Sequence, residues 1–142
     1  MKTLALTLWA VLLIGSLNAQ NQQVVTQSYL DLKEALYSGD VQKASQAGKM
    51  LLTFSKREGS LLTIEKSLSE LINSSSIDNQ RTLLAKISEP IWNYIKSSKN
   101  NAPLFYVQCQ MTRTFWIDDS KAFKNPFYGK QMSSCGKITD SI

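Results

Sequence analysis

Four sulfur-containing side chains near the C-terminal end are the residues whose types and spacing could carry chemistry. Cys109 and Met111 lie two residues apart, and Met132 and Cys135 lie three residues apart. Two thiolates and two thioethers form a soft donor set, which favours Cu(I) over hard cations. If residues 109–111 form a strand, Cys109 and Met111 point to the same face, because side chains alternate along a strand. If the two pairs face each other, the spacing is compatible with a metal site in which two to four of these sulfur atoms hold one Cu(I) ion.

The absence of histidine from the sequence excludes most of the chemistry that could compete with this interpretation. It removes Ser-His-Asp and Cys-His catalysis, the zinc-protease helix and any metal site dominated by histidine. Asp118 and Asp119 are neighbours, so on a strand they would point to opposite faces and could not form an acid–base pair. We interpret them as turn residues. The two cysteines also lack the Cys-x-x-Cys spacing of redox enzymes, and we predict a protein that is not an enzyme.

The composition is typical of one folded globular domain that does not bind nucleic acid. Of the 142 residues, 43% are hydrophobic and 19% are charged. The formal net charge is +5, but the basic residues are spread along the chain without a run of like charges. Binding to nucleic acid requires a concentrated basic face, and this sequence does not provide one.

The N-terminal segment has the three parts of a secretory signal peptide. Met1-Lys2 gives a positive start, residues 4–14 form an uncharged and mostly apolar run, and residues 15–19 supply small residues before Gln20. The run is short for a bilayer span. We therefore predict a signal peptide at residues 1–19, a single domain at residues 20–142, and a periplasmic or secreted protein. An uncleaved N-terminal membrane anchor is the alternative.

Export gives the two cysteines a second interpretation. Two cysteines in an exported protein usually form a disulfide. A bridge between Cys109 and Cys135 would close a loop of about 26 residues, for which the chain-entropy model gives about 3.5 kcal/mol of stabilisation. A reducible disulfide that alternates with a metal-bound dithiol would be compatible with both interpretations, so the metal site and the disulfide both stay open.

Residues 25–98 are predicted to form helices, which must help to position the sulfur-containing residues. Four stripes of apolar residues recur at helical spacing: Val25, Tyr29, Leu32 and Leu36; Ala44, Ala47, Leu51 and Phe54; Ile64, Leu68 and Leu71; Leu84, Ile87, Ile91 and Tyr94. Gly39 is expected to end the first helix and Asp40 to cap the second. Pro90 predicts a kink near residues 86–90, or a split with Ser88 capping a short final helix. The short connections predict an antiparallel, up-and-down bundle of about four helices.

The remaining residues, 101–142, form an aromatic tail that contains both cysteines. Residues 104–107 and 115–117 are short β-prone runs, which predict a hairpin or a pair of strands. Asn125-Pro126 indicates a turn, with Gly129 free to adopt an unusual backbone angle. A segment of this size is too small to fold alone, so we expect it to pack on the bundle. The predicted fold class is therefore mainly α, with a small C-terminal β region.

The tail and the helices together resemble a bacterial family, the domain of unknown function 3347, which is common in exported proteins. The residues that carry the resemblance are Tyr106-Val107, Cys109-x-Met111, Phe115-Trp116-Ile117, Asn125-Pro126-Phe127-Tyr128-Gly129, Met132-x-x-Cys135-Gly136, residues 29–36 and Gln80-Arg81. Two positions depart from the family pattern. Gln110 replaces the usual proline, and Asn79 stands where many relatives are expected to carry histidine.

The resemblance implies a role in metal handling, because this domain also occurs attached to adaptor subunits of heavy-metal efflux systems. We therefore expect an exported, non-enzymatic soft-metal-binding domain, with Cu(I) as the candidate ion. A metal-efflux protein or another envelope protein is the expected partner. The alternative is a structural or protein-interaction module of the cell envelope, in which a Cys109–Cys135 disulfide replaces the metal site.

Overall fold

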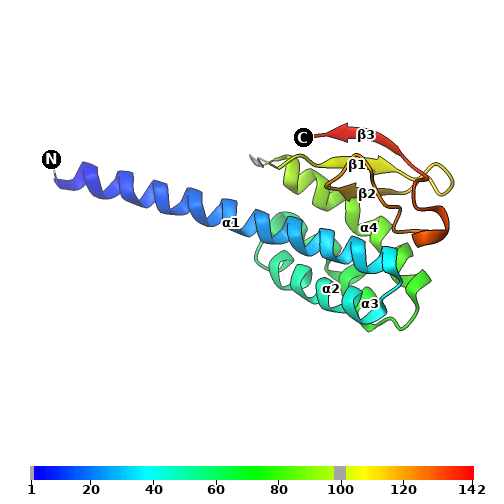
Figure 1. Ribbon diagram of the computed structural model, residues 1–142. Helices are drawn as coiled ribbons and strands as arrows, with labels where there is room; N and C mark the ends of the chain where they lie inside the picture. Colours follow the sequence, from blue (N-terminus) through cyan, green and yellow to red (C-terminus); the bar gives the residue numbers. More distant parts are fainter. Residues whose placement is uncertain (1, 98–101) are drawn as a thin grey trace.

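The computed structural model describes the backbone of residues 2–97 and 102–142, with side chains from residue 19 onward. The helical half consists of α1 (Lys2–Ser38), α2 (Val41–Ser55), the 3-10 helix η1 (Gly59–Ile64), α3 (Glu65–Asn73) and α4 (Ile77–Lys96). The C-terminal half consists of β1 (Phe105–Gln108), β2 (Phe115–Asp118), the 3-10 helix η2 (Gly129–Met132) and β3 (Lys137–Ser141). The predicted mainly α fold, a helical bundle carrying a small C-terminal β region, is confirmed (Figure 1).

The N-terminal part of α1 projects beyond the other helices (Figure 1). The predicted signal peptide falls on residues 1–19, and the side chains of residues 1–18 lie outside the described residues. Among the described side chains of α1, the first buried one is Gln22, whose Nε2 donates to the backbone oxygen of Ile95 at 2.9 Å. Among the helices in the described residues, none is both long enough and apolar enough to cross a bilayer.

Local signals set the helix boundaries as predicted. Gly39 has a φ of +79°, a left-handed conformation that glycine adopts without a steric penalty, and α1 ends just before it. Asp40 caps α2 by accepting a hydrogen bond from the backbone N–H of Lys43 at 3.0 Å. The residues of the four predicted stripes lie in the helical core, with Phe54 and Tyr94 only partly buried.

Pro90 does not divide α4, so the predicted split of this helix is wrong. The helix continues from Ile77 to Lys96 with Pro90 inside it. Ser88 does not cap a new helix, because its hydroxyl donates back to the oxygen of Leu84 at 2.8 Å and lies 2.7 Å from the hydroxyl of Tyr29. Ile87 and Ile91 are fully buried on either side of the proline, and this packing offsets the backbone hydrogen bond that proline cannot make.

Gln80 and Arg81 hold the ends of other helices in place. The Nε2 of Gln80 lies 3.1 Å from the oxygen of Leu71 in the last turn of α3. Arg81 donates from Nε and Nη2 to the oxygen of Leu36 in the last turn of α1, at 3.2 and 3.0 Å. Carbonyls at helix C-termini lack partners within their own helix, so these two side chains satisfy groups that would otherwise be left unpaired.

The C-terminal strands form an antiparallel sheet in the order β2-β1-β3. The predicted hairpin of β1 and β2 is confirmed, with Val107 opposite Trp116. The strand β3 was not predicted. It is an edge strand whose residues alternate between exposed and half-buried, so it lacks the apolar run that marked the other two. Its position is fixed by pairing with β1, where Gln108 lies opposite Lys137.

The sheet packs on the helices through one face and under its own loops on the other. Ile117 joins the helical core, and its N–H donates to the hydroxyl of Tyr29 at 3.2 Å. Burial raises the pKa of Tyr29 above its ordinary 10.0, so this hydroxyl remains protonated. On the other face, Phe105, Val107, Cys109 and Trp116 form a second core, covered by Phe123, Phe127, Tyr128 and Ile138. The expectation that the tail packs on the bundle is therefore confirmed.

Candidate metal centre

The two cysteines lie at the same end of the sheet. Cys109 follows β1 directly, and Cys135 precedes β3 by one residue. Because Gln108 pairs with Lys137 in the antiparallel register, the segments that carry the cysteines continue side by side beyond this pair. Cys109 is fully buried and Cys135 is half-buried, and the structure contains both as free cysteines.

A buried amide connects these two segments. The Nδ2 of Asn125 lies 3.4 Å from the sulfur of Cys109 and 2.7 Å from the backbone oxygen of Cys135. The Oδ1 of Asn125 accepts a hydrogen bond from the N–H of Phe127 at 2.9 Å. The orientation of the amide is unambiguous, because a backbone N–H can only donate and a backbone oxygen can only accept. The sulfur of Cys109 therefore faces a hydrogen-bond donor.

The surroundings of Cys109 lower the pKa of its thiol. Burial raises the pKa of this thiol, but hydrogen bonds oppose that effect. They come from the hydroxyl and the N–H of Thr112, the amide of Asn125 and the N–H of Met111. Together they hold the pKa of Cys109 below its ordinary 9.0. A thiolate is the form of cysteine that binds metal or acts as a nucleophile.

The two methionines lie differently from the cysteines. Met111 and Met132 are 60% and 37% exposed. Met111 lies in a turn, closed by a hydrogen bond of 2.8 Å from the N–H of Arg113 to the oxygen of Cys109. The prediction that Cys109 and Met111 share a strand face is therefore wrong, because β1 ends at Gln108. The chain turns between Met132 and Cys135, where the backbone N–H of Cys135 donates to the oxygen of Met132 at 3.2 Å.

Gly136, directly after Cys135, packs closely against the second core. A Cβ at this position would lie 2.7 Å from Cη2 of Trp116 and 2.9 Å from Cε2 of Phe123. We expect Gly136→Ala to lower the free energy of unfolding by about 1–3 kcal/mol, because overpacking a dense core forces side chains out of their rotamers. Urea denaturation measures this loss. Gly59→Ala is the matched control, since nothing lies within 4 Å of its added Cβ, and an equal loss in both variants would contradict the packing argument.

Asp118 has a role that sequence reasoning missed. It is a buried carboxylate and not the turn residue that was expected, whereas Asp119 is exposed. Its Oδ2 accepts hydrogen bonds of 3.2 Å from Nζ of Lys33, Nε1 of Trp116 and the N–H of Lys124. Lys33 is itself buried, and a cavity of about 350 Å³ adjoins the pair. Lysine and aspartate are rarely buried without a partner, but sequence spacing alone gives no indication that these two meet.

These residues define the chemistry that is available. Over the described residues, no group of three or more histidine, cysteine, aspartate or glutamate side chains could hold a metal ion. A soft-metal centre at this end of the sheet would therefore depend on the two cysteine sulfurs, with the exposed methionine thioethers as the remaining soft donors. A soft ion of low coordination number would need both thiol groups as ligands, and the exposed methionines would need to turn inward to contribute.

The architecture defines a small helical-bundle protein with a C-terminal three-stranded sheet and two free cysteines at one end of it. The chain belongs to the family described as "Protein of unknown function (DUF3347)", whose model matches residues 25–102. A search of curated proteins and a search of solved structures each found no match. The family match covers α1 from residue 25 onward and α2 to α4, and it ends before β1, so the cysteines and Asn125 lie beyond it.

Asn79, where the resemblance leads us to expect histidine in many relatives, lies at the start of α4. The Nδ2 of Asn79 donates to the hydroxyl oxygen of Ser74 at 3.1 Å, and its N–H donates to the hydroxyl oxygen of Ser76 at 3.3 Å. In this chain the residue therefore supports the connection between α3 and α4.

Proposed function

We propose that this protein is an exported, non-enzymatic domain that binds Cu(I) through Cys109 and Cys135. The observation that carries the proposal is the set of hydrogen-bond donors around the sulfur of Cys109, which lowers its pKa although it is buried. A site built only for packing would not need to stabilise a thiolate. Thiolates are soft ligands that select Cu(I) over hard cations.

The position of Cys135 supports a site with two thiolate ligands. The side-chain amide of Asn125 contacts the sulfur of Cys109 and the backbone oxygen of Cys135, so the two cysteine residues lie in the same small region. The exposed thioethers of Met111 and Met132 flank the cysteines in sequence and supply soft donors at the surface. Soft donors on the surface would suit the transfer of an ion from a partner, for which we propose a metal-efflux or other envelope protein.

A disulfide between the same two cysteines is the second candidate, and their common contact with Asn125 favours it as well. In an oxidising compartment such a bridge would join the β1–β2 turn to the start of β3. The protein would then be a structural or interaction module of the envelope. The two functions differ in the state of the thiols and in metal uptake, so one experiment separates them.

The test is an anaerobic titration of the reduced, exported protein with Cu(I), followed by native mass spectrometry. We expect close to one Cu(I) per chain, and loss of uptake in Cys109→Ser and Cys135→Ser, because each variant removes one of the two thiolates. Met111→Leu and Met132→Leu should weaken binding less. Met50→Leu is the control, since Met50 is exposed on α2, outside the cysteine segments.

Three outcomes would decide against the proposal. Uptake of one Cu(I) by the double Cys→Ser variant would show that the ligand assignment is wrong. A fully reduced protein that takes up no Cu(I) would exclude the metal function. A purified protein about 2 Da below the dithiol mass, without a metal adduct, would instead indicate the disulfide-stapled module.

A further inference from the structure

Asn125 makes more hydrogen bonds than a turn residue requires. Asn125 is fully buried, and its backbone N–H donates to the oxygen of Ser133 at 2.8 Å. Its backbone oxygen accepts from the N–H of Gly129 at 3.0 Å. The side chain adds the two contacts to the cysteines and the one to Phe127. Asn125 therefore binds the segment that leads into Cys135 and also contacts the sulfur of Cys109.

The side-chain amide has two hydrogens, and each is directed to a different cysteine residue. One approaches the sulfur of Cys109 and the other binds the oxygen of Cys135. A carboxylate of the same shape would place oxygen against both acceptors, so the geometry requires an amide and not simply a polar group of that size. We infer that Asn125 is the positioning residue of this site, which holds Cys109 and Cys135 as a pair and donates a hydrogen bond to the metal-bound thiolate.

This inference rests on the proposed function for the identity of the metal, but the pairing of the thiols can be tested without copper. Phenylarsine oxide condenses with two adjacent thiols, forming two As–S bonds, and its oxygen leaves with the two thiol protons as water. The reaction involves no oxidation and fails when the thiols are held apart. It therefore reports whether the two sulfurs can reach a single atom.

The experiment compares wild type with Asn125→Asp and Asn125→Ala in the reduced, exported protein. We expect wild type to bind one phenylarsine oxide and to retain no thiol that reacts with iodoacetamide. Loss of the amide should weaken both phenylarsine oxide and Cu(I) by about 10–100-fold, the usual effect of removing a group that supports a metal ligand. Asn73→Asp, at an exposed helical position, is the matched control and should bind like wild type.

The outcomes distinguish this inference from the proposed function. Wild type that binds phenylarsine oxide but no Cu(I), with weaker binding in folded Asn125→Asp, would sustain the positioning role and exclude the copper function. Folded variants that bind phenylarsine oxide as wild type does would overturn the positioning role, even if their melting temperature fell. Wild type that binds no phenylarsine oxide would also overturn it, because the thiols would not form a pair.

A measurement on wild type covers the case in which the variants do not fold. The side-chain amide signals of Asn125 in an NMR spectrum should shift when phenylarsine oxide binds, because one amide hydrogen faces the sulfur of Cys109. The amide signals of Asn73 should stay unchanged. A saturated complex in which the Asn125 signals do not move would contradict the inference.

Discussion

Lys33→Met should lower the free energy of unfolding by about 3 kcal/mol, at the lower end of the range for breaking a buried ion pair. The side chains of Lys33 and Asp118 are 6% and 2% exposed, and Nζ lies 3.2 Å from Oδ2. Methionine keeps much of the lysine side chain's volume but leaves the carboxylate without its cation. The loss should stay near 3 kcal/mol because Trp116, Ser120 and Lys124 still donate to Asp118.

Chemical denaturation of Lys33→Met, Asp118→Asn and the double variant measures the coupling. We expect the stability loss of the double variant to be smaller than the sum of the two single losses by at least about 1 kcal/mol, because the partners are in direct contact. Lys43→Met is the surface control. Its ion pair with Asp40 is exposed, so the loss should be much smaller than at Lys33. Strictly additive losses at Lys33 and Asp118 would show that the pair is not a unit.

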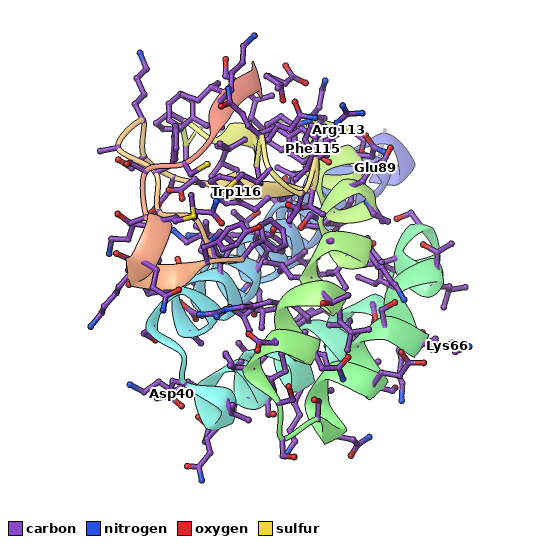
Figure 2. The ribbon with its side chains drawn as sticks, turned by 90° about the vertical axis from the view of Figure 1, so that its right-hand side faces the viewer. Asp40, Lys66, Glu89, Arg113, Phe115 and Trp116 are labelled. Carbon is purple, nitrogen blue, oxygen red and sulfur yellow. The ribbon has the colours of Figure 1, made fainter. Side chains whose placement is uncertain are left out.

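Trp116→Ala should cost about 3–5 kcal/mol, the range for truncating a large buried aromatic side chain. Trp116 is fully buried in the second core, and its ring contacts Phe123 and Phe127 edge to face, with centroids 5.7 and 6.0 Å away. Figure 2 shows it enclosed by side chains, unlike Asp40 and Lys66 at the edge of the helical half. Removing the ring would leave a cavity between β2 and the loops that cover it.

Trp116→Phe separates packing from hydrogen bonding. This variant keeps an aromatic ring but loses the indole N–H that donates to Asp118, so we expect a loss of about 1–2 kcal/mol. Leu62→Ala, at an exposed position, should change stability by less than about 0.5 kcal/mol. Thermal or urea melts followed by circular dichroism measure all three variants. A loss below 1 kcal/mol in Trp116→Ala would mean that the second core does not contribute to global stability.

The aromatic contact between α4 and the sheet shows why the tail depends on the bundle. The ring of Tyr106 stacks between Trp92 and Phe115, with centroids 5.0 and 4.9 Å away. Phe115 lies where β2 meets α4 (Figure 2). Trp92 and Lys96 also donate to the carboxylate of Asp140 in β3. Helix α4 therefore contacts all three strands of the sheet. A C-terminal segment of this size needs such support from the bundle in order to fold.

The positions of the helices were predictable because the signals are local. Apolar residues three and four positions apart share a helix face, and Gly39 and Asp40 act on the residues next to them. The hairpin of β1 and β2 was predictable for the same reason, since its strands are close in sequence. Pro90 shows the limit of such reasoning. Its local cost argued for a break, but the buried residues around it keep α4 continuous.

The sequence alone determined the helical half and the chemical character of the site, namely two thiols and two thioethers without histidine. Only the tertiary structure decided which residues far apart in the sequence contact each other. Lys33 and Asp118 are 85 residues apart, and Cys109 and Asn125 are 16 apart. Contacts of this kind have no sequence period, because they arise when separate elements close one core and each buried polar group must find a partner. For that reason the sequence identified the cysteines as candidates, whereas the contacts of the Asn125 amide came only from the structure.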